Sequence, residues 1–288
     1  MESVPIKLAR WIEGDVTTLT ILRNLSSNEL SLHDRYRPLT GEAMERLTLF
    51  KVLAHNYEEW KKYIESLLSA QPLGDEYAKL NLNRLLLNYL TCAYTIREHF
   101  QVVLKQRFRT EPSKLKDHES FLQRLVAGSW ATAFFFDFRD YVQHRGLGIG
   151  NYSRNVKRTS VTLTITCDAA SLARESRNLE KDWHYSRLKG TEGQLELVPL
   201  LAKFHEQMLK SYARHVAKLM YPELEAAAEF YKVLTSEAVA GRPEFKMVLS
   251  SGDPIIKKSN GRTDYEYSLL CAPNDLFAEV GLSLSKFL

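Results

Sequence analysis

The stretch DEYAKLNLNRLLLNYLTCAYTIREHFQVVLKQRF, residues 75–108, decides the fold of this chain of 288 residues. Its apolar residues recur every three or four positions, which predicts a single amphipathic helix. At 1.5 Å per residue this helix is about 50 Å long. A helix of this length buries its apolar stripe against other helices, so the stretch predicts a mainly α protein.

Two similar patterns flank it, over about residues 42–69 and 113–145. Pro72 and Gly74 separate the first pattern from residues 75–108, and Thr110 and Pro112 separate the second. Short connections between long helices favour antiparallel neighbours. The three patterns therefore predict an antiparallel helical bundle over residues 41–147.

The rest of the chain predicts strands as well as helices. Residues 1–40 form an N-terminal segment whose β-branched run at 15–22 and turn-forming residues at 25–28 are compatible with a β-hairpin. Residues 148–288 are expected to form a mixed α+β extension packed on the bundle. There residues 159–166 alternate as a strand does, and residues 245–249 and 265–270 form weaker strand patterns, with a loop at 250–262. Helical patterns lie at about 169–178 and 194–237, the latter kinked at Pro199 and broken at Pro222.

Composition places few demands on function. Hydrophobic residues make up 44%, charged residues 26%, and the net charge is +4 with a pI of about 8.8. These values are typical of a soluble globular protein, with room for a local basic surface. The first seven residues lack the apolar core of a signal peptide, and no run reaches the roughly 18 apolar residues of a membrane helix. Cys92, Cys167 and Cys271 form no CxxC pair. We therefore expect a cytoplasmic protein that does not associate with a membrane. We also expect that it binds no structural zinc, no other metal and no cofactor.

The sharpest chemical signal is Phe-Arg-Asp-Tyr-Val-Gln-His-Arg-Gly at residues 138–146. Arg139 can bind a phosphate through two parallel hydrogen bonds, and His144 can transfer a proton near neutral pH. Arg followed by His after four to six residues arises by chance about once or twice in such a chain, and a second match occurs at Arg177 and His184. Arg139 is distinguished by its place near the end of the third long helical pattern, before a Gly-rich segment.

A helical bundle with Arg, a polar residue and then His on a late helix resembles the HEPN superfamily. Residues 82–90 and 141–147 are also similar to segments of uncharacterised bacterial HEPN-like proteins, and the resemblance covers about residues 42–147. Many HEPN proteins are metal-independent endoribonucleases in toxin–antitoxin, phage-defence or RNA-processing systems. Others are inactive or bind nucleotides.

The resemblance implies roles for three residues. Arg139 would bind the scissile phosphate, His144 would act as general acid or base, and Asp140, four residues before His144, would orient the imidazole. The reaction is attack of the RNA 2′-hydroxyl on the adjacent phosphate. One histidine performs one proton transfer well, and the resemblance implies a homodimer that places two motifs beside one cleft. In some HEPN proteins the histidine begins a His-x-Tyr motif whose tyrosine is modified, whereas Arg145 and Gly146 follow His144 here.

Further residues are candidates for binding RNA or lining the cleft. The basic and aromatic residues around the motif could contact the RNA backbone and bases: Tyr141, Arg145, Arg154, Lys157 and Arg158. Asn83, Arg84 and Asn88 are polar residues in an otherwise apolar helical pattern and could support the cleft. Each set also has a plain alternative, a basic surface patch for the first and a solvated stripe or interhelical hydrogen bonds for the second.

The motif itself has a structural alternative. Arg and His are favoured in the last turn of a helix, where they meet the negative end of the dipole, and Gly commonly ends a helix. Arg139 could pair with Asp137, Asp140 or Glu98. Three functions therefore stay open: an endoribonuclease acting on RNA with an unidentified antitoxin or defence partner, a non-catalytic module for dimerisation or partner binding, and a nucleotide-binding HEPN relative.

Overall fold

The structure is a computed structural model, and the chain folds into two compact units. The structure describes residues 6–12, 18–69, 74–144, 149–157, 160–168, 172, 194–242, 245–259 and 262–270. One unit, here called the helical unit, is residues 49–216, and the other, the sheet unit, combines residues 1–48 and 217–288. The boundaries predicted at residues 40/41 and 147/148 do not coincide with these. The described residues are mainly helical, with antiparallel sheets, as expected for the fold class.

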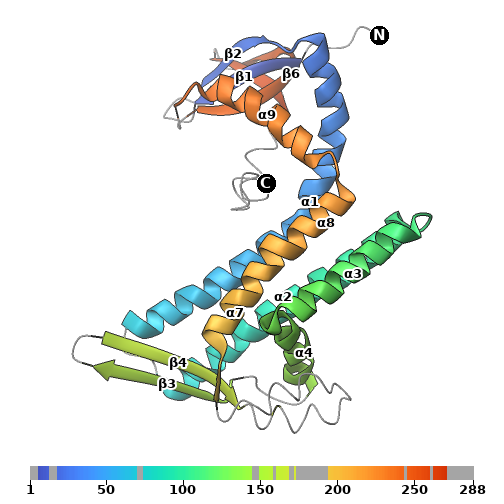
Figure 1. The fold of residues 1–288 in the computed structure, drawn as a ribbon. Helices are drawn as coiled ribbons and strands as arrows, with labels where there is room; N and C mark the ends of the chain where they lie inside the picture. Colours follow the sequence, from blue (N-terminus) through green and yellow to red (C-terminus); the bar gives the residue numbers. More distant parts are fainter. Residues whose placement is uncertain are drawn as a thin grey trace. The chain divides into compact units, whose positions relative to one another are not determined.

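The helices come in the order seen in Figure 1. They are α1 (Ser27–Ser69), α2 (Asp75–Arg107), α3 (Pro112–Gly128), α4 (Trp130–His144), α7 (Leu197–Glu206), the π-helix η1 (Gln207–Ala213), α8 (Arg214–Met220) and α9 (Leu224–Val239). Within the described residues, no helix is both long and apolar enough to cross a lipid bilayer.

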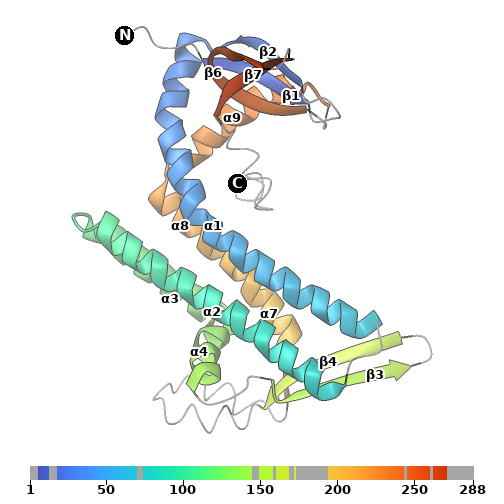
Figure 2. The ribbon, with the colours of Figure 1, turned by 180° about the vertical axis from the view of Figure 1, so that it is seen from behind.

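Aromatic rings hold α1 and α2 together inside the helical unit. Phe50 of α1 stacks on Phe100 of α2 with ring centroids 5.5 Å apart, and Tyr57 meets Tyr89 at 5.9 Å. Later residues of α1 thus meet earlier residues of α2, so the two helices are antiparallel (Figure 2). Tyr212 of η1 packs edge-on against both Phe50 and Phe100.

The third predicted helix is wrong as a single element, because the chain breaks at Ser129 into α3 and α4. Ser129 has an extended backbone, with φ −138° and ψ 105°. Its hydroxyl accepts a hydrogen bond from the backbone N–H of Thr132 at 3.3 Å, which is how a serine caps the start of a helix. The preceding Gly128 weakens helix continuation further.

The helical pattern at residues 194–237 is also interrupted in ways the periodicity did not indicate. Its first three residues, Gln194–Glu196, form strand β5, and residues 207–213 form a π-helix. Pro199 lies in the first turn of α7, where its missing N–H costs no helical hydrogen bond. The predicted break at Pro222 is confirmed, between α8 and α9.

A three-stranded antiparallel sheet belongs to the helical unit. Its order is β3 (Asn151–Lys157), β4 (Ser160–Asp168) and β5. The strand predicted at residues 159–166 is confirmed as β4, whereas the mostly polar β3 gave no alternating apolar signal. The helical pattern at residues 169–178 lies outside the described residues except for Leu172.

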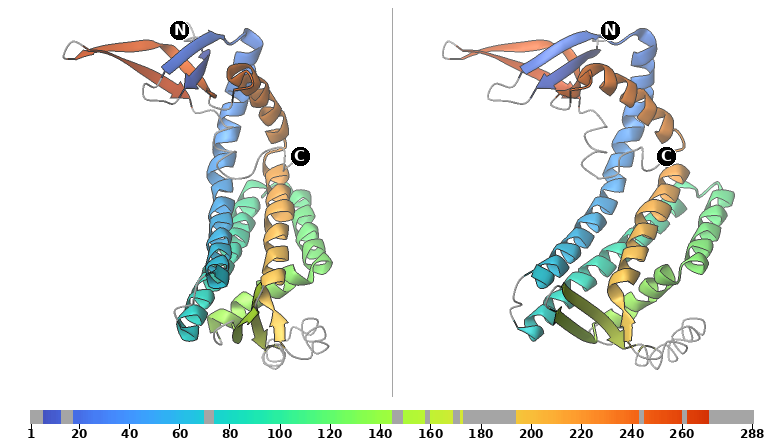
Figure 3. Two further views of the ribbon diagram at one scale, coloured as in Figure 1. Left: turned by 90° about the vertical axis from the view of Figure 1, so that its left-hand side faces the viewer. Right: turned by 60° about the vertical axis from the view of Figure 1, so that its left-hand side comes forward.

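The sheet unit holds four antiparallel strands in the order β2-β1-β6-β7 (Figure 3). They are β1 (Ile6–Ile12), β2 (Thr18–Asn24), β6 (Phe245–Ser259) and β7 (Arg262–Leu270). An N-terminal β-hairpin is therefore present, as β1 and β2, but residues 25–28, expected as its turn, follow β2 and lead into α1. Leu8 and Leu249 are opposite each other in the sheet and pack with Tyr36 of α1 and Tyr231 of α9 in one buried core.

The first long helix begins at Ser27, about fifteen residues earlier than predicted. The reason is a capping box: the backbone N–H of Ser26 donates to the carboxylate of Glu29 at 2.8 Å, and the Glu29 N–H donates to the Ser26 hydroxyl at 3.3 Å. Pro38, expected to mark a break, lies inside the helix.

The loop expected at residues 250–262 is largely strand. β6 continues to Ser259 and pairs with β7 through an irregularity between Ser251 and Ile255. This shift accommodates Pro254, which has no N–H to donate to a neighbouring strand.

Candidate functional site

Arg139 lies on α4 directly after the residues that anchor this helix. Phe134, Phe135 and Phe138 are buried, and Phe135 stacks on Phe204 of α7 with centroids 5.3 Å apart. Arg139 itself is half-buried, and its guanidinium carbon lies 3.8 Å from the centroid of the Tyr94 ring on α2. The apolar face of α4 therefore directs Arg139 to α2.

A second arginine shares the same tyrosine. The guanidinium carbon of Arg97 lies 4.6 Å from the centroids of both Tyr94 and Phe136. Its Nη2 also contacts a carboxylate oxygen of Glu98 at 3.2 Å. We call Tyr94, Arg97 and Arg139 the arginine–tyrosine cluster. It places two permanent cations around one aromatic ring on a partly exposed surface of the helical unit.

The other motif residues follow Arg139 to the end of α4. Asp140, Tyr141 and His144 are in the helix by backbone, and His144 is its last residue. Positions 139 and 144 lie about 140° apart around the helix axis and about 7.5 Å apart along it. Arg145 and Arg158 lie outside the described residues.

Asn83 has a structural position rather than a place in a cleft. It is 4% exposed, and its amide nitrogen donates to the carbonyl of Lys79 at 3.0 Å. Its amide oxygen accepts a hydrogen bond from the buried backbone N–H of Ile149 at 2.9 Å. Asn83 thus joins α2 to the chain that leads into β3.

Replacing Asn83 with alanine should lower the free energy of unfolding by about 1–3 kcal/mol, because the Ile149 N–H then stays buried without an acceptor. Chemical denaturation followed by tryptophan fluorescence measures this loss. Asn88→Ala, an exposed position on the same helix, is the control and should change stability by less than about 0.5 kcal/mol. Equal effects of the two substitutions would contradict the structural role of Asn83.

Arg84 and Asn88 are exposed and precede the cluster residues of α2. At about 100° and 1.5 Å per residue, Arg84 is about 80° around the axis and about 15 Å along it from Tyr94, and Asn88 is about 120° around the axis from Tyr94 and about 180° from Arg97. Arg84 instead lies near Tyr63 of α1, where burial raises the pKa of the phenol and the charge of Arg84 opposes that rise. The structure therefore does not bring these two residues to Arg139.

The two basic residues of β3 that were predicted to bind RNA, Arg154 and Lys157, have different surroundings. Arg154 donates from Nε to the carbonyl of Leu67 at 2.8 Å, in the last turn of α1. This bond satisfies a carbonyl that the helix end leaves open. Lys157, at the end of β3, is exposed and available to an anionic partner.

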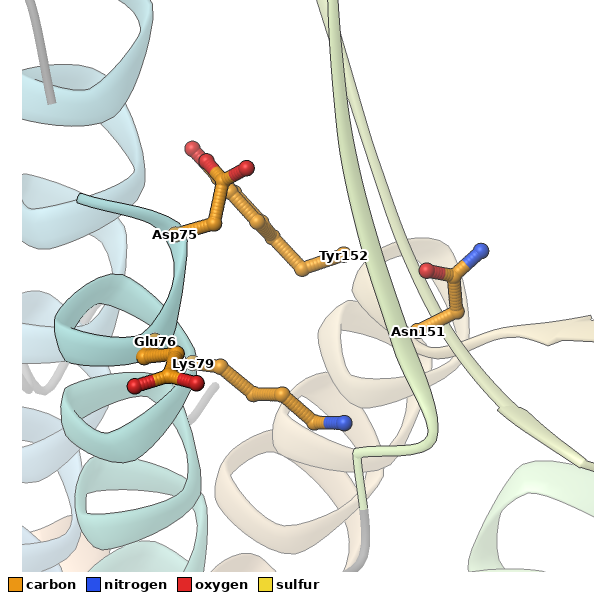
Figure 4. A pocket seen from close by; sticks show the side chains of 5 residues that line it. All are labelled: Asp75, Glu76, Lys79, Asn151 and Tyr152. Carbon is orange, nitrogen blue, oxygen red and sulfur yellow. The ribbon is translucent and has the colours of Figure 1, made fainter.

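A hollow of about 210 Å³ lies between the start of α2 and the start of β3 (Figure 4). Asp75, Glu76, Lys79, Asn151 and Tyr152 line it, and the predicted site residues are not among them. Lys79 extends toward β3 and donates to the carbonyl of Gly150 at 2.8 Å. Burial raises the pKa of Tyr152, and the nearby carboxylate of Asp75 adds to the effect.

His205 on α7 and His215 on α8 are partly buried histidines whose rings pack against aromatic side chains. The His205 ring stacks on Tyr57 at 3.8 Å, and its Nδ1 lies 3.1 Å from the Tyr89 hydroxyl. His215 stacks on Phe121 at 3.8 Å. Burial lowers the pKa of each histidine to about 4, so both are uncharged at neutral pH. Their partners come from other helices, which no local sequence pattern indicates.

His118 of α3 completes the second of these arrangements. Its Nδ1 lies 3.1 Å from Nε2 of His215, so one ring donates a hydrogen bond and the other accepts it. Across the described residues, no group of three or more His, Cys, Asp or Glu side chains is placed to hold a metal ion. His118, His205 and His215 thus have packing roles, and the arginine–tyrosine cluster is the candidate site.

Comparison with protein-family models, curated proteins and solved structures finds no match to this chain.

Proposed function

We propose that the chain is a metal-independent endoribonuclease of HEPN type, in which Arg139 binds the scissile phosphate and His144 transfers a proton. The arginine–tyrosine cluster carries this proposal. Two guanidinium groups lie around Tyr94, and the carboxylate of Glu98 contacts the guanidinium of Arg97. A guanidinium group suits a phosphodiester, since its N–H groups match two phosphate oxygens in geometry.

The reaction proposed for this site is a transesterification. The RNA 2′-oxygen bonds to phosphorus as the bond to the leaving 5′-oxygen breaks, leaving a 2′,3′-cyclic phosphate and a 5′-hydroxyl. One proton leaves the 2′-hydroxyl and one reaches the 5′-oxygen. Arginine stabilises the additional negative charge of the phosphorane, and a histidine supplies a proton transfer without a metal.

The positions of the two residues favour a site that two chains share. Because positions 139 and 144 are about 140° apart around α4, a phosphate contacted by both lies past the helix end or between two copies. A homodimer is therefore part of the proposal. Tyr141, Arg145, Arg154, Lys157 and Arg158 would bind the flanking RNA, and phage defence or a toxin–antitoxin pair is the proposed setting.

A non-catalytic module that dimerises or binds a partner is the second candidate. The observation in its favour is that α2 exposes large apolar side chains: Tyr77 is 54%, Leu80 60% and Val102 53% exposed. An RNA digestion separates the two candidates.

The purified chain is incubated with single-stranded RNA in EDTA. We expect cleavage products with 2′,3′-cyclic phosphate ends, and none from 2′-O-methyl RNA, which lacks the nucleophile. His144→Ala should slow cleavage by about 10²–10⁴-fold, the usual contribution of a general acid or base. Arg139→Ala should remove measurable cleavage and weaken RNA binding.

His55→Ala and Arg124→Ala are matched controls, because both side chains are exposed and neither belongs to the cluster or to the motif. They should cleave as the wild type does. Cleavage that survives His144→Ala, or that needs Mg²⁺, would sink the proposal.

A further inference from the structure

The solvent side of α2 carries a stripe of side chains that winds slowly around the helix, by about 20° for every seven residues. Positions seven apart lie on the same face of a helix, and five of them follow one another along α2. They are Tyr77, Arg84, Thr91, Glu98 and Lys105. Leu80 and Val102 lie beside them, and both are more than half exposed. The opposite side of α2 is packed into the core, which holds the stripe rigid.

The stripe is complementary to itself about Thr91. Seven residues to either side are Arg84 and Glu98, which carry opposite charges. Eleven residues to either side are two apolar side chains, Leu80 and Val102. Fourteen residues to either side are Tyr77 and Lys105, an aromatic ring and a cation, which attract each other.

We propose that this stripe is the interface between two copies of the chain, which pair antiparallel about a two-fold axis at Thr91. In that arrangement each side chain meets its complement from the other copy, and every contact occurs twice. A parallel pairing instead places Arg84 against Arg84 and Glu98 against Glu98. Like charges at facing positions disfavour the parallel pairing.

The charges along the stripe also favour a second copy of the chain over a nucleic acid as the binding partner. A nucleic acid backbone would meet Arg84 and Lys105 favourably, but the carboxylate of Glu98 lies between them along the helix and repels phosphate. The side chain of Glu98 is 44% exposed and contacts Arg97 through one oxygen, so its surface can also receive Arg84 of a second copy. The interface thus reaches the arginine–tyrosine cluster through Glu98 and Arg97.

Sedimentation velocity of the full chain over a range of concentrations, without RNA, tests this interface. Wild type should sediment as a dimer. Arg84→Glu and Glu98→Arg each place like charges against each other twice and should raise the dimer dissociation constant at least tenfold. The double variant Arg84→Glu/Glu98→Arg exchanges the two charges and should restore the dimer. Leu80→Asp, opposite Val102, should also weaken it.

Arg124→Glu, an exposed reversal on α3, is the matched control and should leave the dimer unchanged. Circular dichroism should show equal helix content in all variants, because every altered side chain is partly or fully exposed. A monomeric wild type, or a dimer that neither single reversal weakens, overturns the interface. So does a double variant no better than the single ones. The masses are measured without RNA, so the two proposals can fail separately. An inactive dimer counts against RNA cleavage and leaves the interface standing. A cleaving monomer counts against the interface and against a site shared by two chains, but not against RNA cleavage itself.

Discussion

Replacing Phe100 with alanine is expected to destabilise the helical unit by about 3–5 kcal/mol, the usual cost of removing a fully buried phenyl ring. Phe100 is 0% exposed and stacks on Phe50 of α1, and both rings meet Tyr212 of η1 edge-on. Its removal leaves a cavity where three helices meet, and the surrounding side chains fill it only in part. Guanidinium denaturation followed by circular dichroism at 222 nm measures the loss.

Gln106→Ala is the matched control, because this exposed residue lies on the same helix and should change stability by less than about 0.5 kcal/mol. Phe50→Ala should cost a similar amount to Phe100→Ala. The double variant should cost less than the sum of the two, since the rings share one contact. A loss below about 1 kcal/mol for Phe100→Ala would show that this ring cluster does not hold the helices together.

The long helices could be predicted because their signal is local. In α2 the apolar spacing that identifies the helix also identifies its buried side, so Phe100 was readable as a core residue. Ser26 and Glu29 also have the spacing of a capping box, which indicates the early start of α1 but lies among the turn-forming residues at 25–28. The break at Ser129 was harder to predict, because the spacing of apolar residues in α3 continues without interruption into α4.

The site was only partly readable for a related reason. Arg139 stands out by its chemistry and its place at the end of an apolar helix. Its partners Tyr94 and Arg97 lie over forty residues earlier in sequence, on α2. Which ring meets which cation depends on how α2 and α4 pack, and sequence periodicity does not specify that packing. The role of Asn83 could not be predicted for the same reason, because its amide oxygen accepts a hydrogen bond from Ile149, which is distant in sequence and is brought to α2 by the fold.

The partly buried His205 and His215 make the helical unit sensitive to acid. Unfolded, a histidine has a pKa of about 6.5, whereas burial lowers the pKa of folded His205 to about 4. Between these values the unfolded chain takes up a proton that the folded chain does not. Stability is therefore complete above about pH 6.5 and is lost as the pH falls toward 4. For His205 the loss amounts to about 3 kcal/mol.

His215 has the same lowered pKa and adds a smaller loss in the same window, because solvent screens it more. Glu29, held by Arg23, has its pKa lowered to about 2 and loses its contribution only below about pH 4.5. The stability that depends on the histidines is therefore lost at a higher pH than the stability that depends on Glu29.

Denaturant midpoints measured at pH 7, 5.5 and 4.5 should fall steeply for wild type and less for His205→Gln. Glutamine can still hydrogen-bond the Tyr89 hydroxyl but takes up no proton, so the variant loses some stability at pH 7 and then changes less with pH. His55→Gln, whose side chain is 76% exposed, should keep the wild-type slope. If His205→Gln and His55→Gln show the same slope, then His205 is protonated in the folded chain and its packing between Tyr57 and Tyr89 is looser than the ring distances indicate.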